Sequence, residues 1–450
     1  MSIYRAYDIR GTYGKDLTDE EAERIGKAYG TYVGGGDIAV GRDGRLSSPA
    51  LSEALIKGLV SSGCDVTDIG MVPTPLLYFT IYRYKKDGGI MITGSHNPPQ
   101  YNGFKMCKGT MTLYGEQIQE IGKIAGSGRY RKGEGKAAQK DVSEDYEKYV
   151  KEHVKIKRKM KVVVDGGNGV GGEIASRLLK DLGCEVDELF CDTDGRFPNH
   201  FPDPTVDANL KDLITTVKKE KADLGIAFDG DADRLGIVDD KGRIVRGDQA
   251  LILFSREILK TMKGAKIIFE VKCSQALPED IEKNGGVPVM YRTGHSFIKK
   301  KMKEENAPLA GEMSGHFFFA DDYYGYDDGI YAGTRMIQLL SEKKERLSEI
   351  ISALPKYHAT PEIRVHAPEE KKFVIVKEIT KTFQKKGYDV VTVDGARIQF
   401  GDGWGLVRAS NTEPALILRF EAKTGKRLKE IEKTVKNELL KYPELEKELE

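Results

Sequence analysis

The chain has 450 residues, of which 39% are apolar and 31% charged, a composition typical of a globular protein with about three or four domains. Its 71 Lys and Arg residues nearly balance 70 Asp and Glu residues, so no overall field attracts nucleic acid and we expect no such partner. No apolar run approaches the ~18 residues of a membrane span, and the start, MSIYRAYDIRG, lacks the pattern of a secretion signal. Five dispersed cysteines without CxxC spacing favour reduced thiols. We therefore expect a cytoplasmic protein with no membrane partner.

The first 150 residues alternate between expected helices and strands. Helices are expected from the capping-box pair Thr18 and Glu21 onward, from Ser48 to a stop at Gly63, over residues 75–83 and over residues 144–154. Strands are expected over residues 38–40, 66–69 and 89–93. The alternation predicts a layered α/β domain over residues 1–150.

Residues 92–105, ITGSHNPPQYNGFK, follow the last of these strands and carry several reactive groups. Their turn formers predict a loop throughout: Gly94, Pro98, Pro99 and Gly103. The loop presents the hydroxyl of Ser95 beside the imidazole of His96, with the ammonium of Lys105 further on. A hydroxyl near a proton acceptor and a cation is what a covalent phosphoryl or acyl carrier needs. A Pro/Gly turn with a solvated serine is the alternative.

A second unit, residues 151–250, opens with a strand, a glycine loop and a helix over about 170–182. The loop reads Gly167-x-Gly169-x-x-Gly172, with Asp192 twenty residues on, which is the spacing of a dinucleotide-binding turn. Nothing else in the chain indicates hydride chemistry, so a tight strand–helix turn is the favoured interpretation. A helix over residues 208–220 and a strand over 223–228 lead to the next motif.

That motif, DGDADR, places Asp229, Asp231 and Asp233 at alternate positions before Arg234. In an extended loop this spacing directs all three carboxylates to one side. Oxygen ligands suit Mg²⁺, whose open coordination positions usually take phosphate oxygens. A calcium hand fails its own pattern, because Arg234 stands where that loop needs glycine. An Asp/Gly hairpin turn is the remaining alternative.

Two further units complete the chain. Residues 251–355 continue the α/β pattern, with helices over 248–260 and 295–304, strands over 266–271 and 287–291, and an apolar segment over 309–319. Residues 356–450 form a smaller α+β domain, with strands near 362–365, 389–393, 397–400, 405–409 and 415–421 and helices over 370–386 and 426–442.

Each of these units carries one polar cluster. GEMSGH places Glu312 and Ser314 at alternate positions of a glycine-flanked turn, where both can face neighbouring sugar hydroxyls. RASNTE combines Arg408 with hydroxyl and amide groups at a strand end, a typical site for a phosphate that is not transferred. A polar loop and a plain strand-end turn are the respective alternatives.

Together, TGSHNPPQYNGFK, DGDADR, GEMSGH and RASNTEP resemble the four signature loops of the α-D-phosphohexomutase family, in family order and one per unit, and the likeness begins at YDIRG. It implies three related α/β domains and a smaller C-terminal α+β domain around a central cleft. Met313 resembles the bifunctional phosphomannomutase/phosphoglucomutase branch, whereas glutamine is usual in the phosphoglucosamine branch.

The resemblance also implies residue roles. Ser95 would be the phosphorylated serine, and its phosphate with Asp229, Asp231 and Asp233 would bind Mg²⁺. The residues implied around the transferring phosphate are Arg10, His96, Lys105 (a general-base candidate), Arg234 and His316. The residues implied in substrate binding are Tyr7, Lys272, Thr293, Gly294, His295, Glu312, Ser314, Arg408, Ser410, Asn411 and Thr412.

The activity implied is two phosphoryl transfers between Ser95 and a hexose monophosphate through a hexose 1,6-bisphosphate, which would also act as activator. Mannose and glucose phosphates are the expected substrates, and glucosamine phosphates stay open. A metal-dependent sugar phosphatase is an alternative that would not need the second phosphate clamp. A nucleotide-dependent oxidoreductase and a non-catalytic sugar-phosphate sensor are the remaining alternatives, and the oligomeric state is not predicted.

Overall fold

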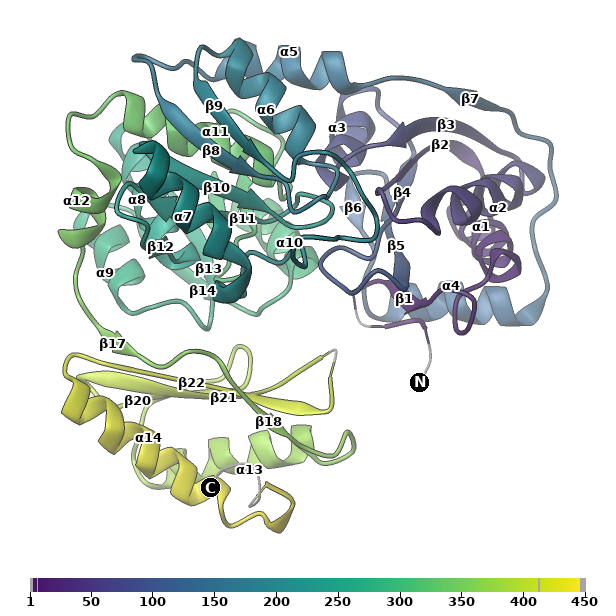
Figure 1. Ribbon diagram of the computed structural model, residues 1–450. Coiled ribbons are helices and arrows are strands. Elements are labelled where there is room, and N and C mark those ends of the chain that lie inside the picture. Colours follow the sequence, from purple (N-terminus) through teal and green to yellow (C-terminus); the bar gives the residue numbers. More distant parts are fainter. Residues whose placement is uncertain (1–2, 6, 412, 446–450) are drawn as a thin grey trace.

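The computed structural model describes residues 3–5, 7–411 and 413–445, which build four sheets (Figure 1). The first is seven-stranded, in the order β1–β5–β4–β2–β3–β7 with β6 paired to β5. Its strands are β1 (Ile9–Thr12), β2 (Gly36–Arg42), β3 (Cys64–Met71), β4 (Gly88–Ile92), β5 (Tyr101–Lys108), β6 (Met111–Thr112) and β7 (Ala137–Gln139). Its helices are α1 (Asp19–Val33), α2 (Ser48–Ser61), α3 (Thr74–Arg83) and α4 (Glu116–Ser127).

Local sequence explains where the first helices begin and which face they bury. The Thr18 hydroxyl accepts a hydrogen bond from the Glu21 N–H at 3.2 Å, so α1 begins where the capping pair predicts. The Glu21 carboxylate accepts from the Tyr4 hydroxyl at 3.0 Å rather than from the cap, so only half of the box forms. Along α2, every fourth residue is fully buried: Leu51, Leu55 and Leu59.

The expectation that residues 92–105 form one loop is wrong for their second half. Residues 101–105 belong to β5, which pairs antiparallel with β4 so that Lys105 lies opposite Met91. Gly103 is therefore a strand residue, and β1 approaches it so closely that a Cβ there would lie 2.2 Å from the Ile9 carbonyl oxygen. The loop proper is residues 93–100, a short connection anchored by a strand on each side.

The second and third units are smaller mixed sheets covered by helices. The second has the order β12–β11–β10–β8–β9 and the third β14–β13–β15–β16. The second contains β8 (Lys161–Asp165), β9 (Glu185–Leu189), β10 (Leu224–Phe228), β11 (Leu235–Asp239), β12 (Ile244–Val245), α5 (Ser143–His153), α6 (Gly172–Asp181), the 3₁₀ turn η1 (Asp207–Leu210) and α7 (Lys211–Glu220). The third contains β13 (Lys266–Glu270), β14 (Val287–Tyr291), β15 (Leu309–Gly311), β16 (Phe317–Phe319), α8 (Gly247–Thr261), α9 (Ala276–Lys283), α10 (His295–Glu305), α11 (Gly329–Ser341) and α12 (Leu347–Ser352). Among the elements that the sequence interpretation did not include are the strands β7 and β9 and the helices α4, α9, α11 and α12.

The fourth unit is built differently from the other three. Its sheet, β17–β22–β21–β20–β19 with β18 on β22, is antiparallel throughout. Its elements are β17 (His358–Ala359), β18 (Ile363–His366), β19 (Val390–Val391), β20 (Ala396–Gln399), β21 (Gly403–Ala409), β22 (Ala415–Ala422), α13 (Lys372–Lys385), α14 (Gly425–Leu439) and η2 (Pro443–Leu445). In Figure 1 this unit, coloured from green to yellow, stands apart below the body formed by the other three.

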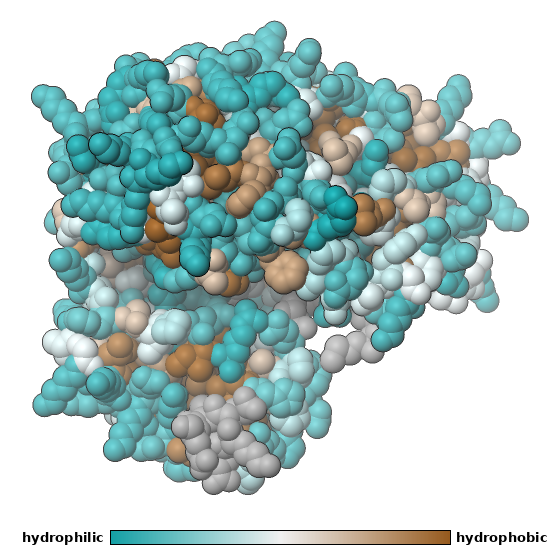
Figure 2. All heavy atoms as spheres, in the orientation of Figure 1, coloured by the Kyte–Doolittle hydropathy of each residue, from teal (hydrophilic) through white to brown (hydrophobic). Residues whose placement is uncertain are grey.

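The hydrophobic cores divide the molecule into two bodies. One cluster runs through the first three units, from Ala39 to Leu354, and joins them, while separate clusters, such as the one from Ile9 to Ala125 in the first unit, lie within single units. The fourth unit has its own cluster, from Val365 to Leu445. A small group containing Val271 and Trp404 lies between the bodies, and the surface is hollowed where they meet (Figure 2). The body should therefore move as one piece, with the fourth unit attached by a smaller contact.

The glycine loop after β8 lies beneath the aspartate loop and does not offer a nucleotide site. A Cβ at Gly169 would lie 2.8 Å from the Gly230 carbonyl oxygen, and one at Gly171 would lie 2.5 Å from the Ala232 side chain. Residues 166–172 are all buried. These glycines permit the two loops to pack backbone against backbone, which supports the tight-turn interpretation over the dinucleotide one.

The remaining chemical features of the fold agree with the composition. All five cysteines are buried free thiols. Among the described residues, no helix combines the length and the apolar character needed to cross a bilayer.

A histidine anchors the segment behind the aspartate loop. His200 Nε2 lies 3.2 Å from both carboxylate oxygens of Asp165, and its Nδ1 lies 2.9 Å from the Phe201 carbonyl oxygen. Burial lowers the pKa of His200, but Asp165 and the carbonyl outweigh it and raise that pKa above its ordinary value. Three residues on, Asp203 Oδ1 lies 3.9 Å from Arg234 Nη1, so this segment touches the aspartate loop.

We predict that His200→Gln lowers the thermal unfolding midpoint by about 2–4 °C at pH 5.5, the effect of roughly 1 kcal/mol. A group whose pKa is raised on folding stabilises fully below its unfolded pKa of about 6.5, and the stabilisation is lost as pH rises through the folded value. The deficit should therefore shrink toward pH 9 in differential scanning calorimetry. The exposed His358→Gln serves as control, and a deficit independent of pH would contradict the assignment.

Candidate active site

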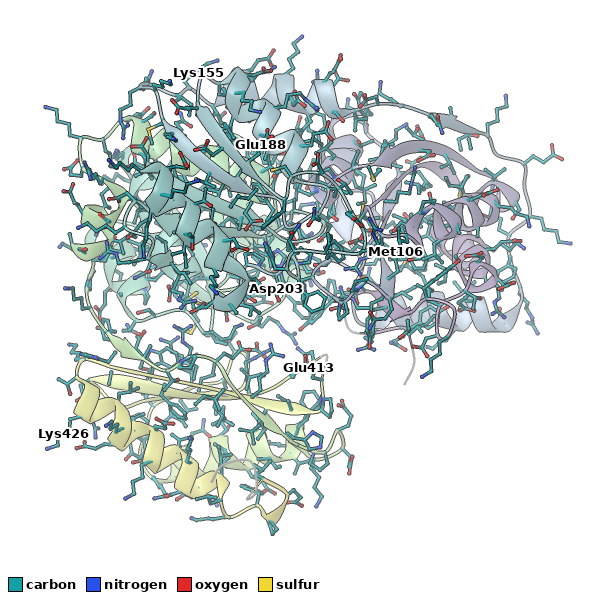
Figure 3. The ribbon with its side chains drawn as sticks, viewed as in Figure 1. Met106, Lys155, Glu188, Asp203, Glu413 and Lys426 are labelled. Carbon is teal, nitrogen blue, oxygen red and sulfur yellow. The ribbon has the colours of Figure 1, made fainter. Side chains whose placement is uncertain are left out.

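Side chains from all four units meet in the recess between the two bodies. Loops after β4, β10, β14, β15 and β21 contribute, most of them at the carboxyl ends of parallel strands, where α/β sheets place ligands. In Figure 3 the labels Asp203, on the body, and Glu413, on the fourth unit, mark the two sides. Direct contacts between units include Ser95–Asp229 (2.8 Å), Arg234–His316 (3.1 Å) and Tyr7–Thr293 (3.4 Å), with Asn411 also bonded to the Tyr7 hydroxyl.

Ser95 is buried and held in a strained backbone conformation. Its φ of 48° lies in the left-handed region, which is uncommon for residues other than glycine. Its N–H donates to the Thr93 hydroxyl at 2.8 Å, while its own hydroxyl donates to Asp229 Oδ2 at 2.8 Å. Its Oγ also lies 3.0 Å from His96 Nδ1. Burial and the nearby Arg234 and Arg10 lower the pKa of His96 well below its ordinary value, so the ring next to the hydroxyl is neutral.

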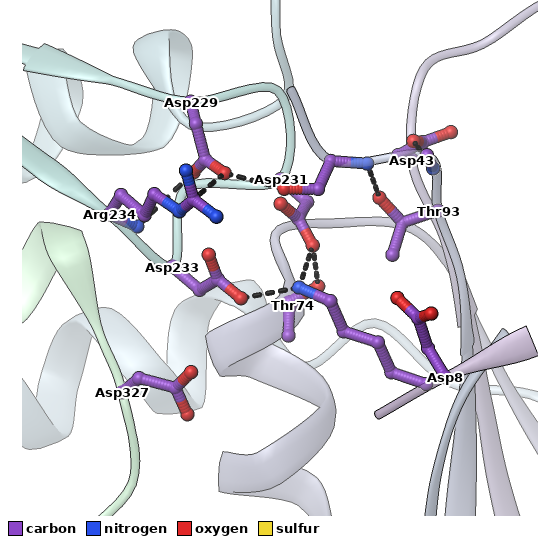
Figure 4. A network of polar contacts seen from close by, with 12 residues as sticks. Asp8, Asp43, Thr74, Thr93, Asp229, Asp231, Asp233, Arg234 and Asp327 are labelled. Atoms are coloured by element: carbon purple, nitrogen blue, oxygen red, sulfur yellow. Dashed lines mark hydrogen bonds and ion pairs between the residues drawn. The ribbon is translucent and has the colours of Figure 1, made fainter. Parts of the chain in front are cut away.

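Asp229, Asp231 and Asp233 are brought together by a turn rather than by an extended loop. Ala232 has a φ of 56°, and its N–H donates to the Asp229 carbonyl oxygen at 3.0 Å. The three carboxylates do lie together as expected, but the expected extended backbone is wrong. One oxygen from each carboxylate lies within 4.8 Å of the others, and all three side chains are fully buried. Figure 4 shows them around Thr74, whose hydroxyl donates to Asp231 Oδ2 at 2.6 Å.

The charges of this cluster fit a bound cation. Burial and the two neighbouring carboxylates raise the pKa of Asp229 well above its ordinary value, which measures how unfavourable a third negative charge is there. Lys105 Nζ lies 2.6 Å from Asp231 Oδ2 and also contacts Asp233. The other oxygens of Asp231 and Asp233 are buried and accept no hydrogen bond from the residues that the structure describes. An oxygen-only donor set with uncompensated charge is what a hard divalent ion binds.

A second group, Asp233, His316 and Asp327, also has donor atoms within 4.8 Å of one another. Here the charge is already balanced, because Lys105 contacts Asp233 and Lys299 donates to Asp327 at 2.8 Å. Arg234 donates to the same histidine at 3.1 Å. Three cations so close disfavour a metal at this place, so the aspartate triad is the better candidate.

Arg45 holds the Ser95 loop in shape. Its fully buried guanidinium donates to four carbonyl oxygens of that loop: Ser95 (2.7 Å), Asn97 (2.6 Å), Pro98 (2.6 Å) and Tyr101 (3.0 Å). Asp43 accepts from its Nε at 3.1 Å and also from the N–H of Gly94 at 3.1 Å. Gly94 leaves room for this clamp, since a Cβ there would lie 2.5 Å from the guanidinium.

The far end of the recess carries cationic groups from the third and fourth units. Arg408 lies near the end of β21, and its Nε is 3.1 Å from the Asp394 carboxylate. The same carboxylate accepts a hydrogen bond from the Thr293 N–H at 3.0 Å. Burial lowers the pKa of Lys272, but Glu270 and Glu362 outweigh it and raise that pKa, so its ammonium stays charged. The Ser410 hydroxyl accepts from the Glu413 N–H at 3.1 Å, which shapes the loop after β21. Thr412 lies outside the described residues.

Glu312 stands between the two ends. It is buried, and one of its carboxylate oxygens accepts from the Gly294 N–H at 2.6 Å. Burial raises the pKa of Glu312 above its ordinary value. Ser314 lies in the same turn and is partly exposed, so these two side chains do share one loop.

Comparison with known proteins matches every unit to one family. Models described as phosphoglucomutase/phosphomannomutase α/β/α domains I, II and III match residues 1–132, 144–242 and 246–357, and the model of the C-terminal domain matches residues 362–438. The chain belongs to the phosphoglucomutase/phosphomannomutase family.

Relatives match over nearly the whole length. A phosphomannomutase/phosphoglucomutase of Pseudomonas aeruginosa is 48% identical over 97% of this chain and 95% of its own. A phosphoglucomutase of Neisseria meningitidis is 46% identical over 98% of both. A crystal structure of a family protein from Burkholderia thailandensis is 44% identical, covers 98% of this chain and 97% of its own, and superposes with a TM-score of 0.93.

Membership of the phosphoglucomutase/phosphomannomutase family confirms the expected fold class, three α/β domains followed by a smaller C-terminal one. The expected boundaries 1–150, 151–250, 251–355 and 356–450 and the roles of single residues stay predictions. The structure brings the expected residues of the transferring end within contact of one another: Ser95, His96, Lys105, Arg234, His316 and the three aspartates. Arg10 pairs with Asp8 at 2.6 Å, and it is close enough to His96 to lower the pKa of that ring.

Several supporting residues were missed by sequence reasoning. They are Arg45, Thr74, Lys299 and Asp327. Arg45 lies in the run GRDGR, whose charges next to a strand end were the available signal. The others sit in ordinary helix or loop sequence. Thr74 reaches the site where the first unit packs against the second, whereas Lys299 and Asp327 meet within the third unit.

We predict that Arg45→Met lowers kcat by about 10²-fold, because a misplacement near 1 Å of a reacting group costs about that much. The side chain is replaced by one of similar length that cannot hold the four carbonyls, while Ser95 itself is kept. The measurement is the steady-state rate of the phosphoryl-transfer reaction proposed below. Arg42→Met, in the same run but partly exposed and paired at 3.7 Å with Asp68, is the matched control. Equal rates in both variants would refute the clamp.

Proposed function

We propose that this protein interconverts hexose 1-phosphates and hexose 6-phosphates of mannose and/or glucose. The observation that carries the proposal is the placement of a buried serine hydroxyl against Asp229, at 2.8 Å, next to a carboxylate cluster suited to a cation. A second, cationic end of the recess lies on the fourth unit, around Arg408. Full-length relatives bearing phosphomannomutase and phosphoglucomutase names support the same activity.

In the proposed reaction, phospho-Ser95 transfers its phosphoryl group to the free O1 or O6 hydroxyl of a hexose monophosphate. The bond from phosphorus to Ser95 Oγ breaks as the bond to the sugar oxygen forms, and the hydroxyl proton passes to a base. The resulting hexose 1,6-bisphosphate turns around and returns its other phosphate to Ser95. Added hexose 1,6-bisphosphate would act as activator by phosphorylating any free serine.

The aspartate triad, with the phosphate on Ser95, would hold one Mg²⁺. When bound, the ion supplies positive charge to the equatorial oxygens of the transferring phosphoryl group. Arg234, next to the triad, and the neutral His96 lie where they could contact the same group. Burial lowers the pKa of Lys105, but Asp231 and Asp233 outweigh it and raise that pKa, so in this arrangement Lys105 is a cation. Its general-base role would require those carboxylates to be neutralised first.

The distal end would hold the phosphate that is not transferred. Arg408, Ser410, Asn411 and Thr412 are proposed as its clamp, with Lys272 and Tyr7 beside them, while Gly294, Glu312 and Ser314 would read the sugar hydroxyls. The separate core of the fourth unit supports a movement that lets the intermediate turn. A sugar phosphatase would not need this second clamp, which is why we favour a mutase. Phosphoglucosamine mutase of the same family is the second candidate.

We predict that the wild-type enzyme converts mannose 1-phosphate or glucose 1-phosphate to the 6-phosphate in the presence of Mg²⁺ and a hexose 1,6-bisphosphate. Ser95→Ala should lower this rate by several orders of magnitude, because no carrier for the phosphoryl group remains. Initial rates compared across mannose, glucose and glucosamine 1-phosphates identify the sugar. Inorganic phosphate released as fast as substrate disappears would indicate a phosphatase, and near-normal turnover in Ser95→Ala would reject both.

Metal binding can be tested apart from activity. We predict that Mg²⁺ raises the thermal midpoint of the wild type and not that of Asp231→Asn, because a ligand that binds only the folded state stabilises it. The exposed Asp207→Asn, whose carboxylate pairs with Arg246, should respond like the wild type. Isothermal titration with Mg²⁺ gives the same comparison directly. A full response of Asp231→Asn would exclude the triad as the metal site.

A further inference from the structure

Asp327 joins two histidines of the recess to a buried lysine. It lies between β16 and α11 and is fully buried. One carboxylate oxygen, Oδ1, accepts from Lys299 Nζ at 2.8 Å. The other, Oδ2, lies 3.2 Å from His316 Nδ1 and 3.4 Å from His295 Nδ1. The planes of the two rings are 18° apart, and each ring has its Nδ1 next to Asp327 Oδ2.

Neighbours on both sides of the His316 ring decide which of its nitrogens carries the proton. Arg234 Nε donates to His316 Nε2 at 3.1 Å, and a guanidinium nitrogen can only donate. Nε2 must therefore carry a lone pair, which leaves the proton of the neutral ring on Nδ1. Nδ1 lies 3.2 Å from Asp327 Oδ2 without an aligned hydrogen bond, so the carboxylate favours the proton there through its charge, whereas a lone pair at Nδ1 would be repelled.

For His295, the surroundings of Nδ1 alone support the same position of the proton. Its Nδ1 lies 3.4 Å from the same oxygen, and neither atom has a hydrogen-bond partner among the described residues. Burial and the nearby Lys299 lower the pKa of His295 well below its ordinary value, so the ring is neutral. A neutral ring facing a carboxylate through Nδ1 carries its proton on that nitrogen.

We propose that Asp327 is a positioning residue that keeps both His295 and His316 protonated on Nδ1, so that the Nε2 lone pair of His316 orients Arg234. The effect passes through three contacts, from Lys299 to Asp327, from Asp327 to His316 and from His316 to Arg234. Arg234 Nε lies 4.0 Å from Asp229 Oδ2, and Asp229 accepts from Ser95. Asp327 would in this way set the guanidinium beside the transferring phosphoryl group without touching substrate. Its effect on rate rests on the proposed function, whereas the position of the protons does not.

Asp327→Asn should move the proton of both histidines to Nε2, although the side chain at position 327 keeps almost the same shape. The ammonium of Lys299 only donates, so the amide oxygen must face it and the amide NH₂ must face the two rings. Each Nδ1 then has to accept, and the proton moves to Nε2. On His316 that N–H would point at the N–H of Arg234 and repel it. The wrong tautomer caused by the equivalent change in a Ser-His-Asp triad lowers kcat by about 10⁴-fold.

The tautomers can be read by ¹⁵N NMR of the full-length, histidine-labelled protein with Mg²⁺ present. The chain has seven histidines, and His295→Asn and His316→Asn identify the two signals, leaving the others as internal references. We expect Nδ1–H on both rings in the wild type and Nε2–H in Asp327→Asn. A wild-type His316 that is protonated on Nε2 or on both nitrogens overturns the proposal without need of the variant. An Asp327→Asn spectrum in which both histidines keep their wild-type tautomers also overturns the proposal.

Asp328→Asn is the matched control for the kinetic part. Asp328 is adjacent, equally buried, and accepts from the hydroxyls of Tyr146 (2.9 Å) and Tyr323 (2.8 Å) rather than from a histidine. We expect Asp327→Asn to lower kcat at least about tenfold with KM changed by less than about threefold, and Asp328→Asn to leave both near wild type. Equal losses in the two variants would show a general packing effect and defeat the proposal. A wild type without mutase activity would reject the proposed function, while the spectra would still decide the position of the protons.

Discussion

Three carboxylates buried in one turn repel each other, and the surroundings of Asp229, Asp231 and Asp233 are arranged to offset that repulsion. Lys105 reaches two of them from β5 of the first unit, and Thr74 donates to one from the start of α3. The serine hydroxyl donates to the third. The nucleophile and the cationic groups are thus drawn to the triad by its charge. Because these contacts cross from the first unit to the second, the same charge also fixes how the two units sit together.

The triad also depends on what lies behind and beside it. Backbone packing against Gly169 and Gly171 sets the turn from below, where side chains would not fit. On the opposite side, Arg45 fixes the Ser95 loop through carbonyl oxygens alone. Since those carbonyls exist whatever the loop's side chains, the clamp controls shape without restricting the chemistry of the residues it presents. The strained φ of Ser95 can persist because it is held by so many bonds.

The sequence was enough to predict the fold class and the main site loops, because those loops carry unusual residues at strand ends. Periodicity placed most helices and strands, including the buried face of Leu51, Leu55 and Leu59. It failed for residues 101–105, where turn formers hid a strand, and for the DGDADR turn, where a left-handed Ala232 replaces extended backbone. Thr74, Lys299 and Asp327 could not be predicted, since their importance comes from contacts between units more than a hundred residues apart or from a shared buried oxygen, which no local pattern records.

The two ends of the recess differ in how firmly they are held. Every charged group of the transferring end belongs to the first three units, which share one continuous core. The distal end is built around Arg408 of the fourth unit, whose core is separate. This unit meets the body through a small apolar group around Val271 and Trp404 and through polar contacts, such as Arg397 with the Val271 carbonyl oxygen and Asn411 with Tyr7. A phosphoryl transfer needs fixed geometry at one phosphate, whereas accepting a sugar from either end needs adjustable geometry at the other. A rigid charged centre joined to a separately folded anion site meets both requirements, because a movement of the fourth unit changes the grip on the sugar and leaves the triad and Ser95 undisturbed.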